Sequence, residues 1–208
     1  AVQWIRKFAP AVIEAWYPGE AAGTAIAEAL FGDYNPAGRL PLTFYKSIRQ
    51  VPSYERYSMK GRTYRFFKGE PVYPFGYGLS YTTFRYSSIK ARKRIRTGES
   101  LTVSVEVQNT GRRAGDEVVQ LYTSDLKASV PVPLRRLEGF QRIHVRAGMK
   151  KRVTFTLKPA QFAAYDDMGR PCIEPGVFRL YVGGKQPGQR RLSRLESNGV
   201  QTDVRVTR

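Results

Sequence analysis

From Phe84 onward, apolar and polar residues alternate along the chain with a period of two. Such alternation is typical of β-strands that bury one face and expose the other. The pattern predicts strands near residues 101–107, 117–123, 137–145, 153–157 and 178–182. Turn-forming sequences, such as Asn109-Thr110-Gly111 and Gly183-Gly184, separate them. We therefore expect a two-sheet β-sandwich of immunoglobulin-like type over residues 84–186.

The first 46 residues follow a different pattern, which predicts a strand, a helix and a second strand. The apolar run Ala11–Tyr17 ends at Pro18-Gly19, as expected of a strand that runs into a turn. From Glu20 the apolar residues recur at helical spacing, and Gly32 can end that helix. The expected buried stripe of the helix consists of Ala22, Ala25, Ile26, Ala29 and Leu30. A second short strand is predicted at Leu40–Phe44.

One helix and two strands cannot form a complete α/β layer, because such a layer needs more strands and helices on both faces. We therefore expect residues 1–46 to be the C-terminal tail of a larger α/β sandwich domain. The chain also begins at Ala1 rather than at methionine. No apolar run reaches the length of about 20 residues that a membrane-spanning helix needs, so we expect no membrane span.

Residues 47–83 form a connector in which aromatic residues are interleaved with glycine and proline. Flat aromatic rings can stack against the apolar faces of sugars, and the candidates for substrate binding are Tyr57, Tyr64, Tyr73 and Phe75. Aromatic side chains also bury large areas when they pack between domains. Packing is the favoured interpretation of this connector, and sugar binding is the alternative.

The C-terminal extension, residues 187–208, is mostly polar. Its apolar anchors are Leu192, Leu195, Val200, Val204 and Val206. This pattern fits either an additional strand or a loose tail.

The net charge of +18 is the unusual feature of the composition. Residues 1–83 hold 10 Lys/Arg against 6 Asp/Glu, whereas residues 84–208 hold 25 against 11, so the excess lies in the second part. A basic surface favours acidic partners such as nucleic acid, anionic lipid or charged polysaccharide. The cations are scattered, apart from clusters at residues 90–94 and 190–191, and neither cluster lies in a nucleic-acid-binding motif. We expect a solvated basic surface and no nucleic-acid partner.

The chain offers few residues for metal binding or nucleophilic catalysis. Cys172 is the only cysteine and His144 the only histidine. A zinc site needs about four such ligands, and a catalytic triad needs a histidine beside its nucleophile. We therefore expect no metal ion or other cofactor, and we interpret His144 as a surface or half-buried residue.

Six segments of the chain are similar, in order and spacing, to signatures of glycoside hydrolase family 3, the family of β-glucosidases and β-xylosidases. In the first part they are WYPGEAAGTA (16–25), LFGDYNPAGRLPLTF (30–44) and YPFGYGLSYTTF (73–84). In the second part they are VQNTG (107–111), GDEVVQLY (115–122) and LEGF (137–140), which resemble the fibronectin type III-like domain of that family. The resemblance runs from about residue 11 to residue 184.

The resemblance implies an immunoglobulin/fibronectin III-like β-sandwich preceded by the tail of an α/β sandwich domain. Members of the family place an α/β barrel first, and they are retaining enzymes that need two carboxyl groups. The nucleophilic Asp and the acid/base Glu of the family are expected upstream of this chain, so no catalytic residue is assigned in it. Glu14, Glu20, Glu28 and Asp33 lie in motifs whose role is folding. The resemblance also favours a periplasmic or extracellular location.

The functional expectation has two parts. The full-length protein is expected to be a retaining exo-β-glycosidase whose partners are a β-linked oligosaccharide or glycoside and the missing N-terminal barrel and sandwich domains. This chain is expected to have a structural role and to be inactive alone. The alternative is a free-standing carbohydrate-binding or adhesion module, and the reading frame upstream of residue 1 would discriminate between the two.

Overall fold

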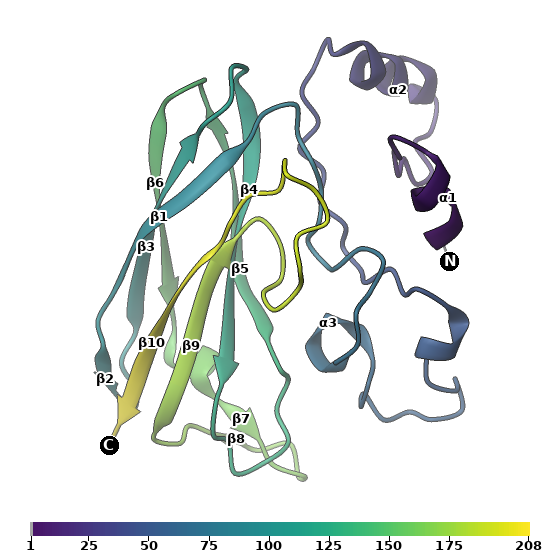
Figure 1. Ribbon diagram of the computed structural model, residues 1–208. Coiled ribbons are helices and arrows are strands. Elements are labelled where there is room, and N and C mark those ends of the chain that lie inside the picture. Colours follow the sequence, from purple (N-terminus) through teal and green to yellow (C-terminus); the bar gives the residue numbers. More distant parts are fainter. Residues whose placement is uncertain (1) are drawn as a thin grey trace.

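The structure is a computed structural model that describes residues 2–208. A β-sandwich occupies one side of the molecule, and the N-terminal segment with its short helices lies along the other side (Figure 1). The helices are α1 (Gln3–Phe8), α2 (Ala22–Phe31), the 3-10 helix η1 (Ile48–Gln50), α3 (Thr63–Phe66) and the 3-10 helix η2 (Pro159–Phe162). No helix within residues 2–208 combines the length and apolar character needed to cross a bilayer.

Two mainly antiparallel sheets form the sandwich. The first has the strand order β1 (Phe84–Ala91), β3 (Leu101–Asn109), β6 (Lys150–Leu157). The second has the order β2 (Arg94–Arg96), β10 (Val200–Thr207), β9 (Gly176–Gly183), β4 (Gly115–Asp125), β5 (Arg136–Val145). A small hairpin of β7 (Ala164–Tyr165) and β8 (Pro171–Cys172) accompanies them. The fold is mainly β, as the alternation predicted.

The alternating pattern sets which face of each strand is buried. In β3 the apolar residues Leu101, Val103, Val105 and Val107 are buried, while the residues between them face outward. Side chains from β4, β6 and β9 meet them in one contiguous core. Because successive strand residues point to opposite faces, the polar and basic residues of these strands are left on the outside.

The C-terminal extension ends in a strand, so the first of its two interpretations is confirmed. β10 pairs antiparallel with β9 and parallel with β2. Val204 and Val206 are buried in the core of the sandwich. β10 therefore completes the second sheet, between β9 and the short edge strand β2.

The helix predicted after Glu20 is present as α2, and Gly32 ends it in the left-handed conformation (φ 82°). Its stripe, however, is mostly uncovered: Ala29 is buried, whereas Leu30 is 61% exposed. The connector contacts the helix here, because the Tyr81 hydroxyl donates a hydrogen bond to the Ala29 carbonyl. The expectation of a buried stripe along the whole helix was wrong for this chain.

The two strands predicted beside α2 are also absent from the described residues. The segment 11–17 is irregular, and in 40–44 the single β-type contact is a bridge from Phe44 to Tyr73. A strand needs a partner for its backbone groups, and the sandwich strands pair only among themselves. The connector 47–83 is irregular as expected, apart from η1 and α3.

The role of β10 leads to a stability prediction. Val204→Asp would place a charge without a partner in the core and should lower the free energy of unfolding by about 3–5 kcal/mol. Gln201→Asp introduces the same residue at an exposed position of the same strand and should change it by less than about 0.5 kcal/mol. Urea unfolding of both variants measures the difference. Equal stability of the two variants would show that β10 is a loose tail.

Candidate functional site

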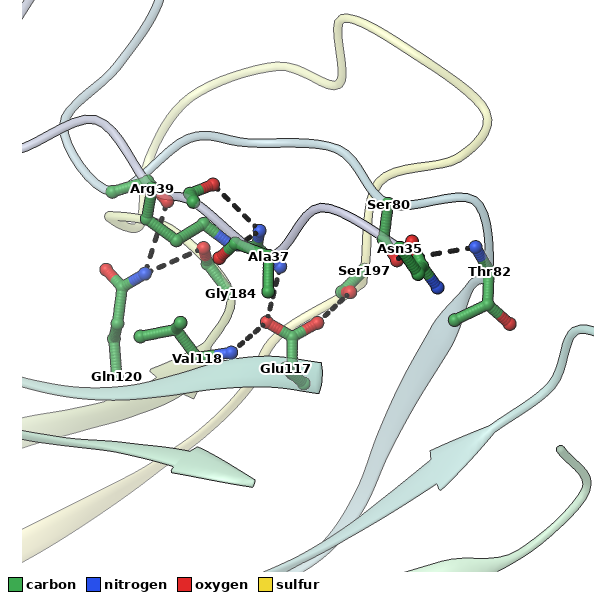
Figure 2. Close-up of polar contacts among 12 residues, drawn as sticks. Asn35, Ala37, Arg39, Ser80, Thr82, Glu117, Val118, Gln120, Gly184 and Ser197 are labelled. Carbon is green, nitrogen blue, oxygen red and sulfur yellow. Dashed lines mark hydrogen bonds and ion pairs between the residues drawn. The ribbon is translucent and has the colours of Figure 1, made fainter. Parts of the chain in front are cut away.

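The segments that resemble the family signatures meet where the N-terminal segment contacts the sandwich. Residues 40–44 and 72–77 run side by side through backbone hydrogen bonds, among them Leu40 N–H to the Tyr77 carbonyl (2.9 Å) and Phe44 N–H to the Tyr73 carbonyl (3.0 Å). This pair of segments lies against β4 and the loop 184–199. We call the contact region the joint, and Figure 2 shows its polar contacts. It is defined by Asn35, Arg39, Gly76, Glu117, Gln120, Gly184 and Ser197.

A buried ion pair lies at the centre of the joint. Nη2 of Arg39 is 2.8 Å from Oε1 of Glu117, and the two side chains are 8% and 0% exposed. Oε1 of Glu117 also accepts the N–H of Val118, and Oε2 accepts the hydroxyl of Ser197 at 2.9 Å. A charge in a dry interior is tolerated only when it is paired and hydrogen-bonded. Glu117 therefore holds Arg39 and the loop around Ser197 in fixed positions (Figure 2).

Arg39 in turn fixes the backbone of its own segment. Its Nη1 donates to the carbonyls of Ala37 (3.1 Å) and Gly38 (3.0 Å). The Gly38 carbonyl is packed against Gly78, where an added Cβ would lie 2.1 Å from the carbonyl oxygen. That distance excludes any larger residue at position 78 without a backbone shift. The guanidinium therefore connects two separate parts of the chain, the backbone of residues 37–38 and Glu117 on β4.

Gln120 forms a second bridge across the joint. Its Nε2 donates to the carbonyls of Gly76 (3.2 Å) and Gly184 (2.8 Å), and its Oε1 accepts the hydroxyl of Tyr122. Gly76 has a φ of 79°, and an added Cβ would lie 2.2 Å from Oε1 of Gln120. Glycine is needed there both for the left-handed backbone and for the close approach.

Asn35 lies just after α2 and connects this part of the chain to the connector and to the residue before β4. Its Nδ2 donates to the Ala114 carbonyl at 3.0 Å. Its Oδ1 accepts the hydroxyl of Ser80 (2.8 Å) and the N–H of Tyr81 (2.7 Å). The side-chain amide thus uses its oxygen twice and one of its two N–H groups within the joint.

A second buried ion pair closes the loop beside the joint. Nζ of Lys185 contacts Oε2 of Glu196, with side chains 9% and 3% exposed. Oε1 of Glu196 accepts the N–H of Ser193 at 2.8 Å, and Nζ of Lys185 also donates to the Arg190 carbonyl at 3.2 Å. These contacts connect residues within the loop 184–199, and Ser197 connects the loop to Glu117.

Tyrosines around the joint are held in the neutral form. Burial raises the pKa of Tyr77 and of Tyr181 to about 12, and the negative charge of Glu196 adds to the effect on both. Burial also raises the pKa of Tyr86 well above its ordinary range, with a smaller contribution from Glu117. These hydroxyls therefore ionise only at a higher pH than that of an exposed tyrosine.

The structure places the four predicted sugar-binding residues in two environments. Tyr64 stacks on Phe75 (ring centroids 4.1 Å apart, 18° between planes), and its hydroxyl accepts the N–H of Leu137 on β5. Tyr73 stacks on Tyr77 at 5.2 Å. These three candidates are half-buried and pack the connector on itself and on the sandwich, whereas Tyr57 is 96% exposed. Sugar binding by the four residues stays a prediction.

The residues of the joint were not predicted from the sequence. Their partners lie far apart in the chain: 78 positions separate Arg39 from Glu117, and 80 separate Glu117 from Ser197. One signal was present. Glu117 takes a core-facing position of β4, in register with the buried Val119 and Leu121, and a carboxylate at such a position calls for a cation.

Comparisons with known proteins identify the two regions that the joint connects. Residues 1–81 match the model of the glycosyl hydrolase family 3 C-terminal domain, and residues 117–186 match that of the fibronectin type III-like domain. The chain belongs to glycoside hydrolase family 3. The expected family is therefore confirmed, and the contact between the two matched regions is the joint.

The related proteins include both xylosidases and glucosidases. A xylan 1,4-beta-xylosidase of Xylanibacter ruminicola is 42% identical over 83% of this chain and 20% of its own length. A periplasmic beta-glucosidase of Salmonella typhimurium is 39% identical over 84% of this chain and 25% of its own length. This family 3 chain thus spans about a fifth to a quarter of these relatives.

Solved structures of the family have the same fold. A β-glucosidase from Listeria innocua in complex with glucose matches 99% of this chain and 29% of its own with a TM-score of 0.83 at 31% identity. A β-glucosidase from Erythrobacter marinus matches 93% of this chain and 25% of its own with a TM-score of 0.78 at 40% identity.

The buried ion pair yields a prediction about stability. Arg39→Met leaves Glu117 buried without its cation and should cost about 3–5 kcal/mol of unfolding free energy. Arg39→Met combined with Glu117→Met should cost less than Arg39→Met alone, because no uncompensated charge remains. Arg142→Gln, which removes an exposed Arg–Asp pair, is the control and should cost about 1 kcal/mol or less. Urea unfolding measures all three, and a double variant that is less stable than Arg39→Met alone would contradict the pairing.

The raised tyrosine pKa gives a prediction about alkaline pH. Tyr181 ionises near its ordinary pKa of 10.0 when unfolded and at about 12 when folded. The stabilisation that comes from keeping this hydroxyl neutral in the folded chain is therefore fully present below pH 10. It is lost as the pH rises towards 12. The decline in unfolding free energy between pH 10 and 12 should be about 2 kcal/mol smaller in Tyr181→Phe than in the parent chain. Identical declines in denaturant unfolding at the two pH values would contradict the burial of this hydroxyl.

Proposed function

We propose that this chain forms the C-terminal part of a retaining exo-β-glycosidase that hydrolyses terminal β-linked sugars, and that it serves there as a structural support. The observation that carries the proposal is the joint. The family 3 C-terminal region and the fibronectin type III-like region share the buried pair Arg39–Glu117, so the sandwich holds the neighbouring region in place. The substrates of the full-length protein are β-linked oligosaccharides or glycosides.

The carboxylates of this chain do not suit the chemistry of retaining hydrolysis. That chemistry needs a nucleophilic carboxylate and an acid/base carboxyl group about 5–5.5 Å apart on either side of a bound sugar. Glu117 and Glu196 are the buried carboxylates of residues 2–208, and each is fixed by a cation and by further hydrogen-bond donors. Neither is free to attack or protonate a glycoside. We therefore assign the catalytic pair to the expected upstream domains.

The N-terminal segment presents the surface on which those domains would pack. Many of its large apolar side chains are exposed: Trp4, Phe8, Ile13, Trp16, Tyr17, Leu30 and Phe31. Exposed apolar patches of this kind mark interaction surfaces. α1 and α2 stand on the side of the molecule away from the sandwich (Figure 1). The uncovered stripe of α2 fits a helix that covers a sheet formed by upstream residues.

An activity assay tests this proposal. The purified 208-residue chain should release no aryl alcohol from an aryl β-glucoside or an aryl β-xyloside above the rate in buffer, because we assign the catalytic carboxylate pair to upstream domains. A complete family 3 β-glucosidase at the same concentration is the positive control. Release that exceeds the buffer rate and is lost in Glu117→Gln or Glu196→Gln would overturn the assignment of these carboxylates to structure.

A further inference from the structure

A group of exposed cations lies on the second sheet, at the edge formed by β2. Lys93, Arg94, Arg96 and Arg205 make up this group, which we call the basic edge, and all four residues are exposed. It includes part of the basic cluster 90–94, which lies where the chain leaves β1 and enters β2.

The strand register places the arginines of the basic edge next to one another. β2 runs parallel to β10, with Arg94 beside Arg205 and Arg96 beside Thr207. Ile95 is buried in the core, so Arg94 and Arg96 both project outward. Neighbouring strands lie about 4.8 Å apart and alternate residues of one strand about 6.6 Å apart. Three guanidinium groups therefore share one small area of the outer face.

The nearby carboxylates form their ion pairs with cations outside the basic edge, and Asp203 also exerts an electrostatic effect on one of its members, Lys93. Asp203 is held by Arg179 through two hydrogen bonds of 2.9 and 3.0 Å, and Glu99 is paired with Arg92 at 3.4 Å. Within residues 2–208, none of the four cations forms an ion pair. Clustered charges of one sign attract an oppositely charged ligand more strongly than scattered charges do.

The basic edge is far from the surface assigned to the upstream domains. β2 and the C-terminal end of β10 lie on the side of the sandwich opposite α1, α2 and α3 (Figure 1). Its cations therefore lie apart from the apolar surface that we assign to the upstream domains.

We propose that the basic edge binds the carboxylates of an acidic polysaccharide, that is, a chain of uronic acid residues. Guanidinium groups bind carboxylates through paired hydrogen bonds, and a polyuronate presents a carboxylate on each sugar ring along an extended chain. The neighbouring arginines on the outer face of the sheet can contact carboxylates on successive sugar rings of such a chain. The choice of a carbohydrate ligand rests on the proposed function, in which the full-length enzyme acts on β-linked oligosaccharides or glycosides.

Edge protection and nucleic-acid binding would also use exposed cations on a short edge strand. Charged residues at such an edge prevent sheets from pairing with one another. Nucleic acid would bind cations too, but single strands are usually held by aromatic stacking. β2 and β10 contain no aromatic residue, so the strands of the basic edge favour a carboxylated polysaccharide over a single-stranded nucleic acid.

The experiment compares two triple variants of the 208-residue chain. One carries Arg94→Gln, Arg96→Gln and Arg205→Gln. The control carries Arg112→Gln, Arg146→Gln and Lys151→Gln, which removes the same charge from exposed positions at the other end of the sandwich. Affinities for immobilised polygalacturonate, a neutral β-glucan and double-stranded DNA are measured by biolayer interferometry at low and at physiological salt. Circular dichroism and the thermal midpoint verify that the variants are folded.

We expect the parent chain to bind polygalacturonate in a salt-sensitive manner and not to bind the neutral glucan. The basic-edge variant should bind polygalacturonate about tenfold more weakly, the sum of three modest surface ion pairs, while the control should lose less than about threefold. Equal losses in the two variants would reduce the effect to net charge and overturn the proposal. Absence of polygalacturonate binding would overturn it in favour of edge protection, and tighter binding to DNA with the same variant dependence would make nucleic acid the ligand.

The outcome is independent of the test of the proposed function. Binding of polygalacturonate requires no hydrolysis, so a chain that released aryl alcohol would refute the structural assignment of its carboxylates and leave the binding result intact. Failure of binding, with the activity assay negative as expected, would refute the basic-edge proposal alone.

Discussion

The buried contact between Arg39 and Glu117 is the constraint on which the arrangement of this molecule depends. Glu117 faces inward from β4, beside Val119, where water does not reach it. A carboxylate in that position destabilises the sandwich unless a cation accompanies it. The cation comes from a segment 78 positions earlier in the chain. The sandwich and the N-terminal segment therefore depend on each other for stability.

The family signatures in this chain have a structural meaning. Asn35, Arg39, Gly76, Glu117 and Gln120 each belong to a segment that resembles a signature, and all of them lie in the joint. Their hydrogen bonds link the end of α2, the connector and β4 into one unit. None of them is free to react with a sugar. In this part of a family 3 protein, the recognisable sequence encodes how two regions are docked, and catalysis is assigned to residues upstream.

The sequence predicted the parts of the fold that depend on local pattern. Alternation gave the positions of β3, β4, β6 and β9, and helical spacing with Gly32 gave α2. The predicted strands at 11–17 and 40–44 were wrong because a strand also needs a partner, which no local pattern supplies. β2 has one buried residue, Ile95, and pairs with a strand more than a hundred positions later, so neither its existence nor its partner was visible in advance. The joint could not be predicted for the same reason. In the connector, Tyr64 stacks on Phe75, while sugar binding by the four candidate residues stays a prediction.

Native-state hydrogen exchange tests the mutual dependence of the two regions most directly. The amides of Leu40 and Phe44 report on the N-terminal segment, since they donate to Tyr77 and Tyr73, and the amide of Val105 reports on the sandwich core. If the joint couples the regions, these amides exchange with similar free energies of opening, close to that of global unfolding. Exchange of Leu40 and Phe44 at a far lower free energy than Val105 would show that the segment opens alone and would contradict the account.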